Sequence, residues 1–288
     1  MTLRTGIVIR STPATRADWD EEVRRVDGLG HDVLLIPDHL GLWPPLSPLV
    51  AAAYVSDRLR LGVQVLNNEF WNPALLAREA AAVDVLTGGR LELGFGAGHA
   101  QVEFEMAGIP YDPPGPRIDR LAAAVPRVRR LLAGEGELPT AQEQIPFMVG
   151  GNGDRVLALA ATEADIVGLT GFTSGTGRTH TDLSHFTWTG LADRIDYVRR
   201  RAGDRFAGLE LSILVQLAAL TDDRRARAEA FGEGRLDPDM LLDSPFVMLG
   251  SPSGLADHLA RLREMGVGYV TAFDTSAEAL AAARSRDV

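Results

Sequence analysis

Short apolar runs alternate with longer amphipathic segments along nearly the whole chain, and this alternation limits the fold more than any other feature. Val33–Ile36 is continuously apolar, as a parallel strand buried on both faces must be. Thr15–Leu29 carries its apolar side chains at helical spacing. We count eight such strand and helix units. This count predicts an α/β fold of the (β/α)8 TIM-barrel class, with functional loops at the carboxyl ends of the strands.

The strands are expected at residues 5–10, 33–36, 59–66, 91–95, 146–149, 165–169, 209–217 and 269–273, with a short extra strand at 246–250. A helix over 117–132 is expected to be interrupted at Pro126, because proline lacks the N–H that a helix interior needs. The connection at 170–189 is long and rich in Gly, Ser and Thr, so we interpret it as a lid or substrate loop. No linker divides the chain, and one domain over residues 1–288 is expected, with insertions in the loops at the carboxyl-terminal face.

The composition predicts a globular chain without membrane spans. Of its 288 residues, 45% are hydrophobic and 24% are charged. No apolar run reaches the roughly 18 residues that a spanning helix needs, and no apolar signal segment is apparent. The chain has no cysteine, which excludes disulfides and agrees with a cytoplasmic location. Its net charge of −10 repels phosphate backbones and anionic lipids, so nucleic acids and membranes are not expected partners.

The chain also lacks lysine, and all 29 of its basic residues are arginine. Arginine stays protonated and forms no Schiff base. Lysine-dependent aldolases, pyridoxal phosphate enzymes and the phosphate loop of nucleotide triphosphatases are therefore excluded as functions.

Residues able to carry chemistry follow three of the predicted strands. Asp38 and His39 follow the second strand, and the Gly96-Ala97-Gly98 turn with His99 follows the fourth. The glycine-rich segment 150–155 follows the fifth strand and opens a helix, where free amides can hold a phosphate. Parallel strand ends meet at one rim, so these groups are expected to lie close together. Each glycine segment alone is equally compatible with a turn that only reverses the chain.

The third strand exit and the long loop offer further polar and aromatic residues. Phe70 and Trp71 follow the third strand and either line a pocket or pack under a neighbouring loop, the second interpretation being favoured for Trp71. Arg178, His180 and His185 lie in the loop. Without cysteine or clustered carboxylates near these histidines, no metal site is expected. The Gly-x-Ser-x-Gly motif of serine hydrolases is absent.

Several motifs in order resemble the luciferase-like monooxygenase superfamily, and within it the branch that uses the deazaflavin coenzyme F420. The motifs are Asp38-His39 with Trp43 four residues on, 61–65 before Asn72-Pro73-Ala74, 87–94 with Gly96-Ala97-Gly98, and 146–153. Each motif is weak, but together they cover nearly the whole chain in the right order.

The resemblance implies a barrel with a flavin or deazaflavin across its mouth. Gln64-Val65 matches the bulge where family members hold a non-proline cis peptide behind the ring. His39 is the catalytic residue that the resemblance implies, and His99 is a second candidate. The implied cofactor-binding residues are Asp38, Gln64, Val65, Gly96, Gly98, Gly150, Gly151, Asn152, Gly153, Arg155 and Thr170. The expected substrate-binding residues are Trp43, from the motif after the second strand, and Phe70 and Arg178, from the third strand exit and the long loop. The resemblance also implies a homodimer, although no interface can be identified from the sequence.

His99 marks a departure from the family pattern, because the sugar-phosphate dehydrogenases of this branch carry glutamate there and many other members carry tryptophan. The proton donor is therefore open, and a sugar phosphate is not the expected substrate. We expect hydride transfer between F420 and a small organic substrate. Two alternatives stay open: a monooxygenase that binds riboflavin phosphate (FMN) in the same place, and a barrel that binds such a cofactor without catalysis.

Overall fold

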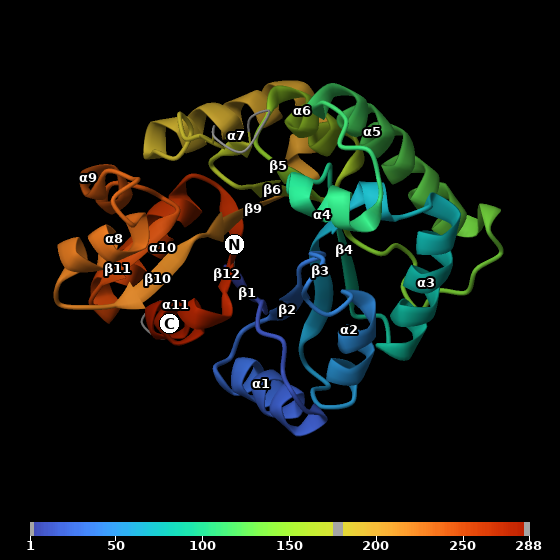
Figure 1. The fold of residues 1–288 in the computed structure, drawn as a ribbon, viewed down its shortest axis with the longest axis horizontal. Coiled ribbons are helices and arrows are strands. Elements are labelled where there is room, and N and C mark those ends of the chain that lie inside the picture. Colours follow the sequence, from blue (N-terminus) through green and yellow to red (C-terminus); the bar gives the residue numbers. More distant parts are fainter. Residues whose placement is uncertain (1–2, 175–180, 285–288) are drawn as a thin grey trace.

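Eight parallel strands close into a barrel surrounded by helices, as the sequence predicts (Figure 1). The computed structural model describes residues 3–174 and 181–284. Around the barrel the strands follow the order β1-β12-β9-β6-β5-β4-β3-β2. Their bounds are β1 Arg4–Val8, β2 Val33–Ile36, β3 Arg60–Asn67, β4 Leu91–Gly96, β5 Phe147–Gly151, β6 Ile166–Leu169, β9 Glu210–Val215 and β12 Val267–Phe273.

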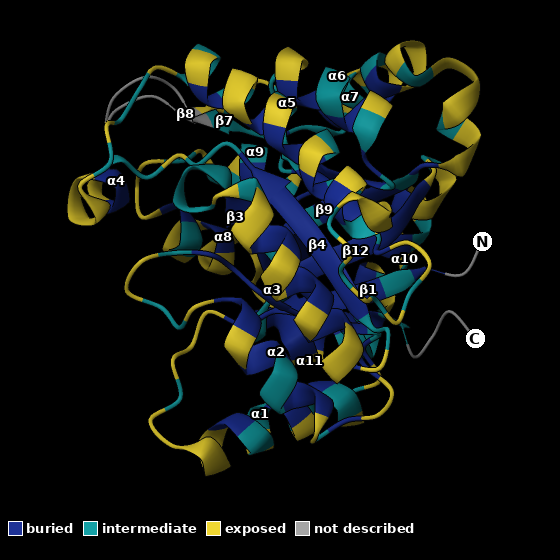
Figure 2. Ribbon diagram, turned by 90° about the vertical axis from the view of Figure 1, so that its right-hand side faces the viewer, coloured by how far each residue is buried: buried dark blue, intermediate teal, exposed yellow. Residues whose placement is uncertain are grey.

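Helices follow the strands and cover the outside of the barrel. The α-helices are α1 Arg16–Gly28, α2 Leu46–Ala53, α3 Pro73–Leu86, α4 Gln101–Ala107, α5 Pro114–Arg130, α6 Asp154–Glu163, α7 Trp188–Ala202, α8 Arg224–Gly232, α9 Pro238–Leu242, α10 Pro252–Glu264 and α11 Ala277–Arg284. Shorter helical turns are η1 Asn68–Phe70, η2 Leu131–Glu135, η3 Gly203–Gly208 and η4 Asp274–Ser276. Figure 2 shows the strands buried and the outer faces of α1, α3 and α5 exposed.

Side-chain capping explains where several helices begin. Thr15 and Asp18 form a reciprocal capping box at the start of α1. Asn72 caps α3 by accepting hydrogen bonds from Ala74 N and Leu75 N, with Pro73 in the first helical position. The hydrogen bonds that begin these two helices are therefore formed by residues next to them in the sequence.

Insertions extend the loops at the carboxyl ends of three strands. After β4 the chain forms α4 and a loop, and after β6 it forms the small antiparallel pair β7 Thr173–Ser174 and β8 Thr181–Asp182. After β9 it forms β10 Leu217–Leu220, which pairs in parallel with β11 Val247–Gly250 outside the barrel. Figure 1 shows β10, β11, α8 and α9 gathered on one side of the barrel.

Two details of the predicted elements are wrong. The expected strand over 209–217 ends at Val215, because the chain leaves the barrel at Gln216, whose amide bonds to Phe246 O. The expected interruption at Pro126 does not occur, since α5 continues through it to Arg130. Buried side chains of α5, including Leu121 and Val128, pack into the core on both sides of the proline, and this packing compensates for one missing hydrogen bond.

A network of ion pairs lies near the amino ends of the barrel strands, opposite the functional end. Glu92 Oε1 lies 2.8 Å from Arg4 Nη1 and 2.6 Å from Arg60 Nε. Arg4 also pairs with Glu210 and stacks 4.3 Å from the ring centroid of the buried Tyr269. These contacts join five strands of the barrel, β1, β3, β4, β9 and β12.

Candidate active site

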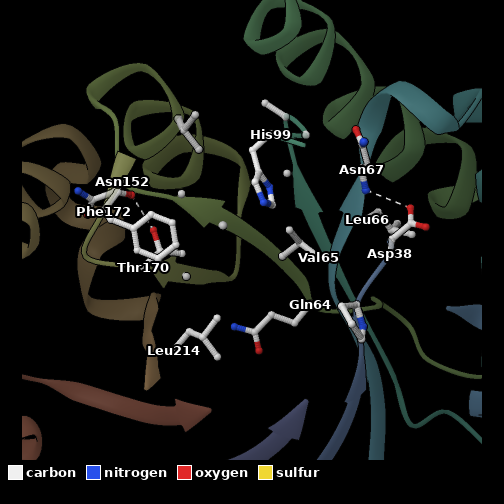
Figure 3. Close-up of a pocket in the computed structure, with 18 of the residues that line it drawn as sticks. Asp38, Gln64, Val65, Leu66, Asn67, His99, Asn152, Thr170, Phe172 and Leu214 are labelled. Atoms are coloured by element: carbon white, nitrogen blue, oxygen red, sulfur yellow. Dashed lines mark hydrogen bonds between the residues drawn. The ribbon is translucent and has the colours of Figure 1, made fainter. Parts of the chain in front are cut away.

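A cavity of about 440 Å³ lies at the carboxyl ends of the barrel strands. Every strand of the barrel contributes to its wall, from Arg10 just after β1 to Phe273 at the end of β12. The strand exits singled out in the sequence meet here: Asp38, His39, Gln64, Val65, Gly96, Gly98, His99, Gly150, Gly151, Asn152, Gly153 and Thr170 all line this cavity. Figure 3 shows Asp38, His99 and Asn152 at different sides of it.

Asp38 is buried, with 8% of its surface exposed, and one carboxylate oxygen is fully engaged. Its Oδ2 accepts hydrogen bonds from Asn67 N at 3.0 Å and from Trp71 Nε1 at 2.8 Å. Burial raises the pKa of Asp38, and these two hydrogen bonds oppose that rise without cancelling it. The hydrogen bond from the Trp71 indole therefore links the segment after β3 to the segment after β2.

His39 is held by a carboxylate that was not predicted from the sequence. Its Nδ1 lies 2.7 Å from Oε1 of Glu103 in α4, and Glu103 is only 8% exposed. A carboxylate can only accept, so Nδ1 donates this hydrogen bond and Nε2 is left to exchange a proton. The short helix after the glycine turn therefore places an acid against the histidine of the second strand exit.

His99 stands edge-on to His39, with ring centroids 5.5 Å apart. Its ring projects into the cavity (Figure 3). The enclosing walls lower the pKa of His99, and the neighbouring His39 and Arg117 lower it further, while Glu103 opposes them. His99 is therefore neutral at pH 7 and can donate or accept a hydrogen bond.

Arg117 in α5 fixes the backbone of the turn that carries His99. It is only 4% exposed and donates hydrogen bonds to the carbonyl oxygens of Asp112, Ala97 and Gly98. Its guanidinium also stacks on the ring of Tyr111, 4.6 Å from the centroid. Arg117 lines the cavity, so a positive charge lies in its wall.

The peptide bond between Gln64 and Val65 is cis, in agreement with the family resemblance. The side chain of Val65 projects into the cavity, and Gly94, Gly96 and Gly150 make room for it (Figure 3). A Cβ at Gly96 would lie 2.6 Å from Val65 Cγ2, and a Cβ at Gly150 would lie 3.0 Å from Val65 Cγ1. These glycines therefore serve the packing of Val65, which gives the cavity an apolar floor.

The segment after β5 forms a backbone cradle at the start of α6. Gly153 is the N-cap of α6 and provides no side-chain cap, so the first amides of the helix are open to an acceptor. Asn152 is 3% exposed, its Nδ2 lies 3.2 Å from His185 Nδ1, and its Oδ1 has no partner among the described residues. Thr170 directly follows the neighbouring strand β6 and donates a hydrogen bond to Phe172 O at 3.1 Å.

Three other predicted site residues lie away from this cavity, and one lies outside the described residues. Arg155 forms an ion pair with Asp119 instead of lining the cavity. Trp43 packs against Trp19 with ring centroids 5.8 Å apart. Phe70 lines a second cavity of about 430 Å³, which shares Asp38 and His39 with the first and is otherwise apolar. Arg178 lies between residues 174 and 181 and is not described.

Glu103, Arg117 and Arg10 line the cavity but were not predicted as site residues. Glu103 contacts His39, which lies 64 positions away in the chain, so no local spacing marked it. Arg117 and Arg10 carried no local signal, because tertiary structure alone brings them to the cavity. Arg10 lies 3.7 Å above the ring centroid of Phe273.

No trio of histidine and carboxylate side chains within residues 3–174 and 181–284 is arranged to hold a metal ion. Among the helices that the structure describes, none has the length and apolarity required to cross a membrane.

Comparisons with known protein sequences identify a family and several of its members. The profile of the luciferase-like monooxygenase family matches residues 4–235. A 5,10-methylenetetrahydromethanopterin reductase from Archaeoglobus fulgidus is 31% identical over 156 residues, covering 50% of this chain and 46% of that protein. An F420-dependent glucose-6-phosphate dehydrogenase from Intrasporangium calvum is 32% identical over 181 residues, covering 54% and 53%. The chain thus matches about half the length of these relatives.

Solved structures share the fold at low sequence identity. An F420-dependent secondary alcohol dehydrogenase in complex with an F420-acetone adduct superimposes with a TM-score of 0.77 at 15% identity, over 98% of both chains. The oxygenating constituent of 3,6-diketocamphane monooxygenase from Pseudomonas putida, in complex with FMN, gives 0.70 at 15% identity, over 98% of this chain and 97% of that one. These structures agree with the barrel, and the profile match over most of the sequence shows that the chain belongs to the luciferase-like monooxygenase family.

Proposed function

We propose that this chain is an oxidoreductase that uses the deazaflavin coenzyme F420 and transfers a hydride between it and a small organic substrate. Family membership makes F420 or a flavin the expected cofactor class. Both relatives described above carry names of reductases or dehydrogenases, and one is named for F420.

The observation that carries this proposal is the pairing of His39 with Glu103 at the edge of the cavity. The hydrogen bond of 2.7 Å fixes the ring orientation and directs Nε2 away from the carboxylate. A histidine held in this way can release or accept a proton at one defined atom. Hydride transfer to or from an alcohol, carbonyl or imine requires such a proton movement beside the reacting carbon.

The residues of the cavity suit a flat ring with an anionic tail. The apolar side chain of Val65 provides a surface on which a ring can lie. The amides at the start of α6, with the unpartnered oxygen of Asn152 beside them, provide donors and one acceptor for a phosphate and its hydroxylated linker. Arg117 contributes a positive charge in the wall.

A bound deazaflavin supplies a ring carbon that gives or takes a hydride. The protein's own contribution is orientation, exclusion of water and proton movement. His39 holds or releases the proton at Nε2, and Glu103 stabilises the charge that His39 gains. His99, kept neutral by its surroundings, offers a hydrogen bond to the reacting oxygen or nitrogen of the substrate. The apolar second cavity beside His39, lined by Phe70, is the proposed place for the remainder of the substrate.

The test is an assay with a panel of secondary alcohols, ketones and unsaturated carbonyl compounds, using F420 and FMN in parallel, each both without oxygen and in air. The proposal expects a change in the absorbance of F420 that depends on substrate and requires no oxygen. Turnover with reduced FMN that consumes oxygen would instead assign the chain to the monooxygenases. Binding of a cofactor with no turnover across the panel would favour a carrier.

An FMN-dependent monooxygenase is the second candidate. One solved structure with the same fold is a complex with FMN, and its name describes an oxygenating enzyme. The glycine cradle after β5 suits the phosphate of FMN as well as that of F420, because both are phosphate esters on a ribityl chain. Oxygen uptake in the assay above separates this candidate from the first.

A further inference from the structure

The side chain of Gln64 lies in the wall of the cavity with no visible partner. Its Oε1 is buried and accepts no hydrogen bond from any described residue. Figure 3 shows the carboxamide extending across the cavity towards Leu214 on β9. The neighbouring wall residues Val65 and Leu214 are apolar and offer it no side-chain donor.

Gln64 differs in this respect from Asn67, another polar residue of β3, which has hydrogen-bond partners. Asn67, three positions on, accepts a hydrogen bond from Glu69 N through Oδ1 and donates its own backbone N–H to Asp38. Leaving a buried amide oxygen without a donor costs about 1–3 kcal/mol. A ligand that brings the missing donor into the cavity would recover this free energy, so the carboxamide is arranged for a group that binds there.

We propose that the carboxamide of Gln64 binds the pyrimidine edge of the cofactor ring. This inference rests on the proposed function, because it requires a flavin or deazaflavin in the cavity. The pyrimidine edge offers an N–H between two carbonyl groups. An amide matches it with one acceptor and one donor, Oε1 for the N–H and Nε2 for a carbonyl.

The other end of the ring system fits this position less well. In a flavin the outer carbocycle carries only methyl groups, which would leave Oε1 unpartnered. In F420 it carries one hydroxyl, which satisfies one atom of the amide and leaves the other free. Because the pyrimidine edge is the same in both cofactors, Gln64 sets the orientation of the ring and does not discriminate F420 from FMN.

The test is a double-mutant cycle that combines a protein change with a ligand change. Wild type and Gln64→Leu are titrated with the phosphate-free deazaflavin that carries the ribityl chain and with its N3-methyl derivative, and dissociation constants are measured by fluorescence quenching. Gln64→Leu is expected to weaken binding of the unmodified ligand by about tenfold or more, because two hydrogen bonds are lost. The N3-methyl ligand already lacks the N–H, so the same substitution should weaken it by less than about threefold.

Gln216→Leu is the matched control. Gln216 lines the same cavity, but its Nε2 already donates to Leu214 O at 3.2 Å. Its substitution should change the affinities for both ligands by the same factor. If Gln64→Leu fails to fold, as judged by its thermal unfolding transition, Gln64→Met provides a second measurement. Methionine has nearly the length of glutamine but neither the amide donor nor the amide acceptor, so it should weaken the unmodified ligand and again spare the N3-methyl one.

Equal losses for both ligands in Gln64→Leu, or no loss at all, would overturn the assignment of Gln64 and leave the proposed function standing. Failure of the wild type to bind any deazaflavin or flavin would overturn both. The wild-type titration therefore distinguishes the two outcomes.

Discussion

The Nδ1 atom of His39 and the Oε1 atom of Glu103 lie 2.7 Å apart, although 64 positions separate the two residues in the chain. One follows β2 and the other lies in α4, the short helix that follows the glycine turn after β4. The barrel therefore builds a histidine–carboxylate pair from two strand exits. Removing the carboxylate is the direct way to measure what the pair contributes.

Glu103→Ala should lower turnover about 10- to 100-fold, because His39 loses the charge-assisted hydrogen bond that orients it. Glu103→Gln keeps an acceptor oxygen for Nδ1 and should recover part of the rate. Cofactor affinity should change little in either variant. Steady-state kinetics and cofactor titration check this, and equal rates for wild type and Glu103→Ala would remove the pair from the mechanism.

Gly96→Ala should disturb the floor of the cavity. The new Cβ would lie 2.6 Å from Val65 Cγ2, so the valine must move or the barrel must strain, at a cost of about 1–3 kcal/mol. Gly28→Ala is the matched control, since a Cβ there meets nothing within 4 Å and alanine favours the helix. Urea unfolding of both variants gives the comparison, and equal stability would show that Val65 adapts freely.

Asp38→Leu should destabilise the protein by about 2–4 kcal/mol, because the Asn67 N–H and the Trp71 indole N–H would lose their shared acceptor. Asp38→Asn retains an acceptor oxygen and should cost about half as much. Chemical denaturation measures both changes. If the leucine variant were as stable as the asparagine variant, the two hydrogen bonds would contribute little to the free energy of unfolding.

The sequence predicted the architecture well because its signals are local. The continuous apolar run of β2 and the cap of α3 by Asn72 depend on neighbouring residues, and both appear in the structure. The cis bond at Gln64 was implied by family resemblance, not by any property of the two residues.

Contacts between distant segments were harder to predict. Arg155 lies where a phosphate-binding charge was expected, but Asp119, from another helix, pairs with it. Arg117 was not singled out, since its role comes from carbonyl groups that fold back against it. Pro126 carried a strong local signal against a helix, and tertiary packing of α5 overrode it.

His31 should make the protein less stable in mild acid. Burial lowers the pKa of His31 to about 4, with its backbone hydrogen bond to Ala277 opposing the change and the charge of Arg284 supporting it. The unfolded chain takes up a proton near pH 6.5 and the folded protein only near pH 4. The neutral ring therefore supports folding above pH 6.5, and this contribution is lost as the pH falls towards 4.

His31→Gln removes the titrating group, so its stability deficit relative to wild type should shrink over this pH range by up to about 3 kcal/mol. Denaturation of both proteins at a series of pH values measures the difference. A deficit that stays constant between pH 6.5 and 4 would show that His31 does not titrate as its burial requires.

Hydrogen–deuterium exchange with and without F420 tests most directly whether separate strand ends hold one ligand. The account predicts that a saturating concentration slows exchange together in the segments around Asp38, Val65, Gly98 and Gly151, which line the same cavity. The outer faces of α1 and α3 should be unaffected. Protection confined to one of these segments, or located on the outer helices, would contradict the account.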